Sequence, residues 1–187
     1  MTATDKAVSD ALMSVSAVGQ KRLVIVGASG MVGGYALRYA LNSSTVERVT
    51  SIGRKKLGIS HPKLKEVLHQ NFADCSALAD ALVGYDAVVY CLGTYTGAVP
   101  DAELRAITAG YTIEFARVFR NSSPNAVFSF LSGNGADPTG KSRFAFARYK
   151  GEAEKALLAS GFSHVCFSGP HTSTLCSRDR SLISVTG

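Results

Sequence analysis

The sequence lacks the patterns that mark several other classes of protein. Its four cysteines form no CxxC pair and share no metal-ligand spacing with its four histidines, so we expect no metal site. Free thiols in a reducing compartment, and with them a cytoplasmic location, are the simpler expectation. No apolar stretch is long enough to span a bilayer. Despite the net charge of +6, no Lys or Arg run with interleaved aromatic residues is present, so we expect no nucleic-acid partner.

The composition fits one α/β domain with a sizeable core. The chain has 187 residues, of which 46% are hydrophobic and 18% are charged. Residues 1–20 are mostly small and polar, with two aspartates and no arginine, which fits neither a secretory signal nor a typical transit peptide. We expect them to form a flexible leader to a domain over residues 21–167.

A glycine-rich turn at residues 27–33 follows an apolar run at 23–26 and precedes a helical pattern. This order of strand, turn and helix is typical of sites that bind a nucleotide pyrophosphate. Gly27 lets the chain turn sharply off the strand, Gly30 lets backbone amides approach phosphate oxygens, and Gly33 lets the helix pack closely on the sheet. An ordinary tight turn is the alternative interpretation. The residues expected to bind the cofactor here are Gly27, Ala28, Ser29, Gly30, Met31, Val32 and Gly33.

Strands and helices alternate along the rest of the chain. The run 86–92 is of the continuous apolar kind that is typical of a strand covered on both faces. Alternation at this spacing predicts right-handed crossovers and a doubly wound, mostly parallel, Rossmann-like sheet in a single domain. The expected strands are 23–26, 46–52, 67–71, 86–92, 126–131 and one that begins at 164, and the expected helices are 31–41, 75–82, 100–120 and 144–160.

The end of the second expected strand bears on the identity of the cofactor. NAD-preferring sites usually carry Asp or Glu there to hold the ribose hydroxyls, whereas this chain has Gly53 followed by Arg54. An arginine can clamp a 2′-phosphate through its planar fork. We therefore expect Arg54 to bind the cofactor and NADP(H) to be preferred over NAD(H). A solvated basic loop is the alternative.

Six motifs follow one another along residues 21–167: the glycine turn, Ile52-Gly53-Arg54, Asn71-Phe72, Cys91-Leu92-Gly93-Thr94, Leu131-Ser132-Gly133-Asn134-Gly135-Ala136-Asp137 and Tyr149-Lys150-Gly151-Glu152. Together they resemble the atypical short-chain dehydrogenases/reductases, in particular the branch related to the human Tat-interacting oxidoreductase. The resemblance implies an NAD(P)-binding Rossmann fold and an oxidoreductase activity.

The resemblance also assigns positions around the cofactor. Asn71 and Phe72 fall where the family flanks the adenine, with Asn71 in place of the more usual Asp; an amide can still hydrogen-bond an exocyclic amine. The four residues after the fourth strand fall where the backbone passes the nicotinamide, and these are Cys91, Leu92, Gly93 and Thr94. A strand end with its glycine turn is the alternative interpretation of these four.

The family's catalytic residues are only partly present. The resemblance implies a catalytic role for Ser132 and for Lys150, whose family counterpart binds the nicotinamide ribose and lowers the pKa of a tyrosine. That tyrosine precedes the lysine by four residues, and the position is Phe146 here, while relatives often have a second serine at the position of Gly133. Tyr149 lies about 100° around the helix from Lys150, so it cannot take the tyrosine's place unless the helix shifts.

Loss of the tyrosine affects chemistry rather than binding. Phenylalanine cannot donate a proton, and general acid help is typically worth about 10²- to 10⁴-fold in rate. The remaining charged residues of this helix are expected to form a solvated face rather than a catalytic carboxylate pair: Glu152, Glu154 and Lys155.

Two functional classes remain open. The first is an NADPH-dependent reductase of a small aldehyde or ketone, with Lys150 orienting the cofactor and Ser132, a water or a neighbouring hydroxyl replacing the tyrosine. The second is a catalytically inactive NADP(H)-binding regulatory or interaction protein, in which cofactor occupancy sets the conformation. A protein partner, a homodimer and a nuclear or mitochondrial-surface location stay open in either class.

The chain departs from the family after Phe167. Relatives continue with an Arg-Pro-containing strand end and an aromatic segment that helps to build the substrate pocket, whereas residues 168–178 form a polar run without helical or strand periodicity. We hypothesise a frameshift at about Ser168, with a genuinely divergent tail as the alternative. Residues 168–187 are therefore expected to be unlike the family, with the C-terminal substrate lobe reduced or missing.

Overall fold

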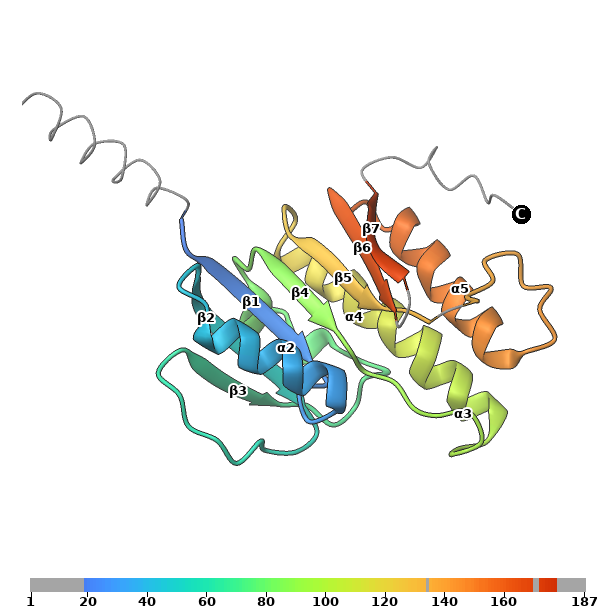
Figure 1. Cartoon of the computed structure of the whole chain (residues 1–187), viewed down its shortest axis with the longest axis horizontal. Coiled ribbons are helices and arrows are strands. Elements are labelled where there is room, and N and C mark those ends of the chain that lie inside the picture. The colour runs from blue at the N-terminus through green and yellow to red at the C-terminus, as the bar shows by residue number, and fades with distance from the viewer. Residues whose placement is uncertain (1–18, 134, 170–171, 178–187) are drawn as a thin grey trace, which may run out of the picture.

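A single sheet forms the centre of the structure. The computed structural model describes residues 19–133, 135–169 and 172–177. Within them, the strands lie in the order β3-β2-β1-β4-β5-β6-β7 (Figure 1), with β7 antiparallel to β6 and the other pairs parallel. The strands are β1 (Lys21–Val26), β2 (Val46–Gly53), β3 (Leu64–Leu68), β4 (Ala87–Tyr90), β5 (Val127–Leu131), β6 (His164–Gly169) and β7 (Thr172–Ser177).

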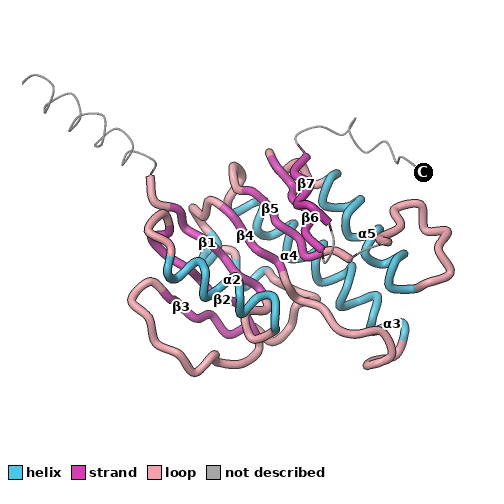
Figure 2. Tube along the Cα trace, in the orientation of Figure 1, coloured by secondary structure: helices cyan, strands magenta, loops and turns pink. Residues whose placement is uncertain are grey.

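Helices cover both faces of the sheet (Figures 1 and 2). Successive residues of a strand point to opposite faces. In β1, Val24 packs in the core cluster with the helices of the C-terminal half, and Ile25 packs in the cluster under α2; both are fully buried. The helices are α2 (Met31–Asn42), α3 (Asp101–Arg105), α4 (Tyr111–Ser122) and α5 (Ala145–Ala159), with a π-helical segment, η3 (Ala106–Gly110), joining α3 to α4, and two 3₁₀ turns, η1 (Ser76–Leu78) and η2 (Asp80–Leu82).

The strand order reverses between β1 and β4. Strands β2 and β3 extend the sheet to one side of β1, and β4, β5 and β6 extend it to the other. The carboxyl ends of these parallel strands meet at one edge, and in sheets of this kind ligands bind in the crevice outside that edge, where the order reverses. The expected doubly wound, mostly parallel sheet is confirmed.

The third expected strand and the helix expected over 75–82 differ most from the structure, while the strand expected over 86–92 is shorter, at Ala87–Tyr90. Strand β3 is shifted from the expected 67–71, because its register with β2 runs from the pair Val49–Leu64 to the pair Gly53–Leu68. The His69 amide still donates to the Gly53 carbonyl oxygen, at 3.0 Å, but the chain then turns away. The expected helix over 75–82 is instead η1 followed by η2, in keeping with the use of 3₁₀ turns as short connectors.

The polar run after Phe167, which has no strand periodicity, nevertheless contributes to the sheet. Strand β6 continues through Gly169, and β7 pairs with it along the edge of the sheet. Backbone hydrogen bonds to one neighbour hold an edge strand, so hydrophobic alternation is not needed to form it. Residues 1–18 of the expected leader and 178–187 of the tail lie outside the described residues.

The cysteines also depart in part from expectation. Cys75 and Cys91 are free thiols, as expected, whereas Cys166 is disulfide-bonded. Sequence spacing contains no signal for this bond, because a disulfide requires two cysteines whose Cα atoms lie close together in the folded chain. The expectation of free thiols is therefore wrong for Cys166.

Candidate functional site

The glycine turn between β1 and α2 is packed too closely to admit side chains at two positions. Gly27 has a φ of +83°, in the left-handed region that favours glycine. A Cβ at Gly27 would lie 3.0 Å from the carbonyl carbon of Cys91, in the segment after β4. At Gly33, a Cβ would lie 2.3 Å from the carbonyl oxygen of Gly27. The sharp turn and the close packing of α2 predicted for these two glycines are confirmed.

The N-terminus of α2 lies directly after this turn. Gly30, its N-cap residue, has extended backbone and makes no side-chain capping hydrogen bond, and the first turn carries no acidic residue. The first amides of a helix have no intrahelical partner, and the helix dipole places positive charge there. The Gly34 amide begins the helical pattern by donating to the Gly30 carbonyl oxygen, at 2.8 Å. The arrangement is therefore suited to binding an anion.

The residues of the turn that are expected to bind the cofactor differ in their exposure to solvent. Ala28 is buried in the core under α2. The others that carry side chains, and the N-cap glycine, are exposed: Ser29, Gly30, Met31 and Val32. A bound pyrophosphate would thus meet backbone amides and the exposed residues, with Ala28 fixing the turn from beneath.

The segment after β4 lies against this turn. The Cys91 amide donates to the carbonyl oxygen of Val26, the last residue of β1, at 2.9 Å. Leu92 and Thr94 are partly buried, Gly93 is exposed, and a Cβ at Gly93 would meet no atom within 4 Å. The structure therefore brings the two motifs together at the carboxyl edge, where the strand order reverses.

The loops after β2 and β3 form another part of this edge. Arg54 is exposed, and its carbonyl oxygen accepts a hydrogen bond from Gln70 Nε2, at 2.7 Å, which ties the two loops together. None of the ion pairs within the described residues involves the Arg54 guanidinium. Asn71 is exposed, whereas Phe72 is 2% exposed and its ring centre lies 6.3 Å from that of Tyr111 in the core. Any role of Phe72 beside an adenine therefore falls to its backbone.

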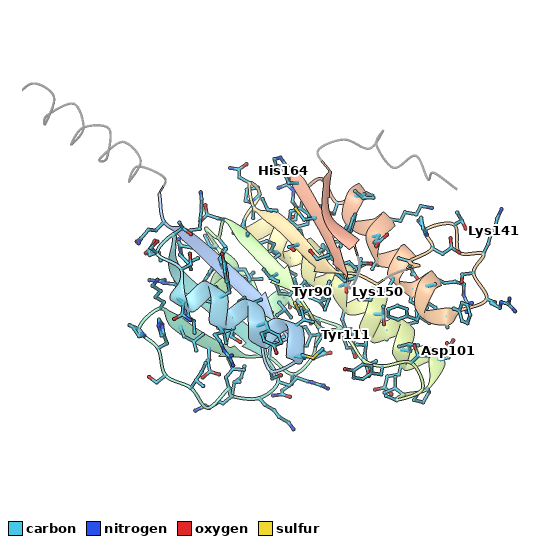
Figure 3. The ribbon with its side chains drawn as sticks, in the orientation of Figure 1. Tyr90, Asp101, Tyr111, Lys141, Lys150 and His164 are labelled. Carbon is cyan, nitrogen blue, oxygen red and sulfur yellow. The ribbon has the colours of Figure 1, made fainter. Side chains whose placement is uncertain are left out.

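Buried polar side chains meet at the end of β5. Lys150 Nζ, on α5, donates to the Leu131 carbonyl oxygen at 2.6 Å and lies 4.4 Å from the centre of the Phe130 ring. The Ser132 hydroxyl donates to the Glu154 carboxylate. Lys150 and Glu154 are one helical turn apart, so they share a face of α5. Lys150 is 6% exposed and Ser132 is 9% exposed, and Figure 3 shows Lys150 close to the strand ends in the middle of the molecule.

Burial dominates the electrostatics of this group. It lowers the pKa of the Lys150 ammonium to about 8, against the attraction of Glu154. It raises the pKa of the Glu154 carboxyl, while the Ser132 hydrogen bond and Lys150 act in the opposite direction. It also raises the pKa of the Cys91 thiol to about 11. Lys150 therefore titrates closer to neutral pH than an ordinary lysine does.

An aromatic contact occupies the position of the family's tyrosine. A Cβ at Gly133 would lie 2.6 Å from Phe146 Cε1 and 2.7 Å from its Cζ, and the ring centre lies 5.9 Å from Lys150 Nζ. The Tyr149 hydroxyl donates to Asp101 on α3, at 2.5 Å. The Tyr149 hydroxyl thus makes its hydrogen bond to a residue outside this group. The Phe146 ring is in contact with position 133 and not with position 132.

Glu154 was expected on a solvated face, and this expectation is wrong. Its carboxylate is partly buried against Ser132, because the helix packs this face onto the end of β5. Glu152 instead forms an ion pair with the exposed Arg105, at 2.6 Å, and Lys155 is exposed as expected. The signal that could have identified Glu154 is its spacing of four residues from Lys150.

Tyr95, beyond the β4 segment, is 81% exposed, and His164 lies at the opposite end of β6 from the site (Figure 3). No described helix combines the length and apolarity needed to cross a bilayer. Nor do three His, Cys, Asp or Glu side chains of the described residues gather where they could hold a metal ion.

Sequence comparison finds relatives among curated proteins, although no protein-family model matches the chain. The chain is 30% identical over 154 residues to the fmp52 protein, mitochondrial, of Aspergillus clavatus, and 29% identical over 154 residues to that of Aspergillus niger; each match covers 79% of this chain and 64% of the relative. It is 28% identical over 163 residues to the HTATIP2 protein of Rattus norvegicus, covering 86% of this chain and 66% of the relative. The chain thus spans about two thirds of the length of these relatives.

Solved structures show the same fold. The enzyme WbmG of Bordetella bronchiseptica, in complex with NAD, superimposes with a TM-score of 0.65 at 16% identity, over 80% of this chain and 52% of WbmG. Uronate dehydrogenase of Agrobacterium tumefaciens gives a TM-score of 0.59 at 19% identity, over 73% of this chain and 54% of the enzyme. The sequence therefore shows a relative of the fmp52 and HTATIP2 proteins, and the solved structures show that its fold is a Rossmann-like domain.

Proposed function

We propose that this chain binds NADP(H) across the carboxyl edge of its sheet. The observation that carries the proposal is the steric fit of the glycine turn, where a Cβ at Gly33 would lie 2.3 Å from the Gly27 carbonyl oxygen. This closeness keeps the uncapped N-terminus of α2 beside the strand ends, where a pyrophosphate can accept hydrogen bonds from its amides. The residues present therefore fit a dinucleotide.

The preference for NADP(H) over NAD(H) rests on the loop after β2. Arg54 is exposed, and two further cations, Lys55 and Lys56, follow it. A guanidinium can bind a 2′-phosphate with two parallel hydrogen bonds, whereas a carboxylate in this place would repel it. Asn71 and the Phe72 backbone would flank the adenine, and residues 91–94 would pass the nicotinamide.

One proposed use of the bound cofactor is the reduction of a small aldehyde or ketone. NADPH supplies a hydride to such a carbonyl. In this reading Lys150 orients the cofactor, and a hydroxyl such as that of Ser132 supplies the proton. Both side chains lie at the carboxyl edge of the sheet, but the Ser132 hydroxyl donates a hydrogen bond to Glu154 and Lys150 Nζ donates one to the Leu131 carbonyl oxygen.

The second use is binding without turnover, and a specific observation favours it. Phe146 stands where the family has its proton-donating tyrosine, and its ring lies against Gly133. Tyr149 cannot substitute, because its hydroxyl is bonded to Asp101. A glycine turn that fits a dinucleotide, with no acidic hydroxyl beside Lys150 among the described residues, suits a regulatory or interaction protein whose conformation depends on NADP(H) occupancy.

Cofactor binding is tested by titrating the purified chain with NADPH and with NADH while following nicotinamide fluorescence. We expect tighter binding of NADPH, and in Arg54→Ala a loss of that preference by about tenfold or more, the scale of a charge-assisted phosphate contact. Lys141→Ala is the matched control, since it removes an exposed cation that lies outside this loop. Equal affinity for both cofactors in the wild type and in Arg54→Ala would refute the NADP(H) assignment.

The two uses differ in NADPH consumption across a panel of small aldehydes and ketones. Binding without consumption by the wild type, together with turnover in Phe146→Tyr, supports the binding protein. Consumption by the wild type supports the reductase.

The fungal relatives are named mitochondrial, so subcellular fractionation of the native chain is the check on the proposed cytoplasmic location. A homodimer or another protein partner is likewise a proposal, checked by light scattering with and without NADPH.

A further inference from the structure

Two departures from the family sequence are in contact in the structure. By the resemblance described above, Gly133 falls where the family often has a second serine, and Phe146 falls where it has a tyrosine. A Cβ at position 133 would lie 2.6 Å from Phe146 Cε1 and 2.7 Å from Cζ. Real Cβ atoms do not approach other heavy atoms so closely, so a side chain at 133 and the ring in its present place exclude each other.

The ring also covers a polar group. Lys150 Nζ lies 5.9 Å from the centre of the Phe146 ring and 4.4 Å from that of Phe130, and it donates to the Leu131 carbonyl oxygen at 2.6 Å. Two aromatic rings and a backbone carbonyl thus surround an ammonium that is only 6% exposed. Attraction between the cation and the ring faces favours this arrangement.

We propose that Gly133 and Phe146 form an apolar plug at the end of β5, in which the ring fills the space of a side chain at 133, covers Lys150 and occupies the place of the proton donor. The two positions act as one unit, because the glycine makes room for the ring. The expected consequence is that bound NADPH is held without reduction of a carbonyl, and this consequence rests on the proposed cofactor site.

The plug itself can be tested without any cofactor, because the chain contains no tryptophan. Phe146→Trp places a single fluorophore in the plug, and acrylamide quenching reports its exposure. Adding Gly133→Ala should displace the ring toward solvent and raise the quenching constant, because a Cβ at position 133 would overlap the ring. Phe144→Trp is the matched control, since Phe144 is 69% exposed and should be quenched equally with and without Gly133→Ala. Unchanged quenching at position 146 would overturn the plug.

A double-mutant cycle, measured as the free energy of unfolding, tests the same contact without introducing a bulkier side chain. Gly133→Ala should change the unfolding equilibrium constant by one factor in the wild type and by a smaller factor in the Phe146→Ala background, and the two factors should differ at least about threefold. Equal effects in the two backgrounds would show that the residues do not share one space.

NADPH measurements on the wild type separate this proposal from the proposed function. If NADPH binds and no carbonyl is reduced, both stand. Carbonyl reduction by the wild type would refute the proposal that the Phe146 ring blocks the position of the proton donor. If NADPH does not bind, the proposed function fails, while quenching and the double-mutant cycle still decide whether the plug exists.

Discussion

The substitution Gly151→Ala is expected to loosen the attachment of the β5–α5 loop to α5. A Cβ at Gly151 would lie 2.0 Å from the Asp137 carbonyl oxygen and 2.4 Å from the Pro138 amide nitrogen. The same loop is fixed by the Asp137 amide, which donates to the Ala147 carbonyl oxygen at 2.8 Å. Because these neighbours are backbone atoms, no side-chain rotation can relieve the overlap.

The expected cost follows from two opposing effects. Ordinary contact begins near 3.4 Å, so the loop must move by more than about 1 Å. Overpacking of this kind costs about 1–3 kcal/mol, occasionally more. Alanine in a helix interior is favoured over glycine by up to about 1 kcal/mol. The net loss should be up to about 2 kcal/mol, which for a domain of this size lowers Tm by up to roughly 8 °C.

Thermal unfolding followed by circular dichroism measures this change. Gly110→Ala is the control, because Gly110 is an exposed helical glycine with no atom within 4 Å of a Cβ placed there, so its Tm should stay constant or rise slightly. If Gly151→Ala raised Tm as Gly110→Ala does, the close packing of the loop on α5 would be refuted.

The remaining predictions concern the cofactor cradle and the buried lysine. Gly33→Ala should weaken NADPH binding by about tenfold or more in the fluorescence titration, because its Cβ would lie 2.3 Å from the Gly27 carbonyl oxygen, and the reasoning fails if Gly34→Ala, with 3.4 Å to its nearest neighbour, is equally harmful. For Lys150, the folded-state pKa of about 8 lies below the ordinary 10.5, so the unfolded chain binds more protons between these values and stability should rise with pH across that window. The increment is up to about 3 kcal/mol in urea unfolding and should be absent in Lys150→Met, so identical pH dependence in the two proteins would contradict it.

Local sequence was sufficient to predict the first βα unit. The apolar run, the glycine turn and the helical pattern of residues 21–42 lie within one short segment, so the steric demands on Gly27 and Gly33 follow from the connection itself. Boundaries were less certain where pairing decides them. Strand β3 lies at Leu64–Leu68 because β2 sets its register, and no feature of 67–71 reveals that choice.

The candidate site was only partly predictable for a related reason. Lys150 and the position of Phe146 came from a motif, but Glu154 was placed on a solvated face although it bonds to Ser132. Whether a helix residue faces solvent or a neighbouring strand end depends on how α5 docks, and that depends on the loop held by Gly151.

The sequence by itself determined the parallel α/β architecture and the dinucleotide cradle, because hydrophobic periodicity and glycine sterics act over a few residues. The tertiary structure decided what surrounds Lys150. Only when β5 and α5 pack together does the Phe146 ring meet Gly133, and does burial lower the pKa of the lysine. Burial and contact between segments far apart in the chain are properties of packing, and no local pattern encodes them.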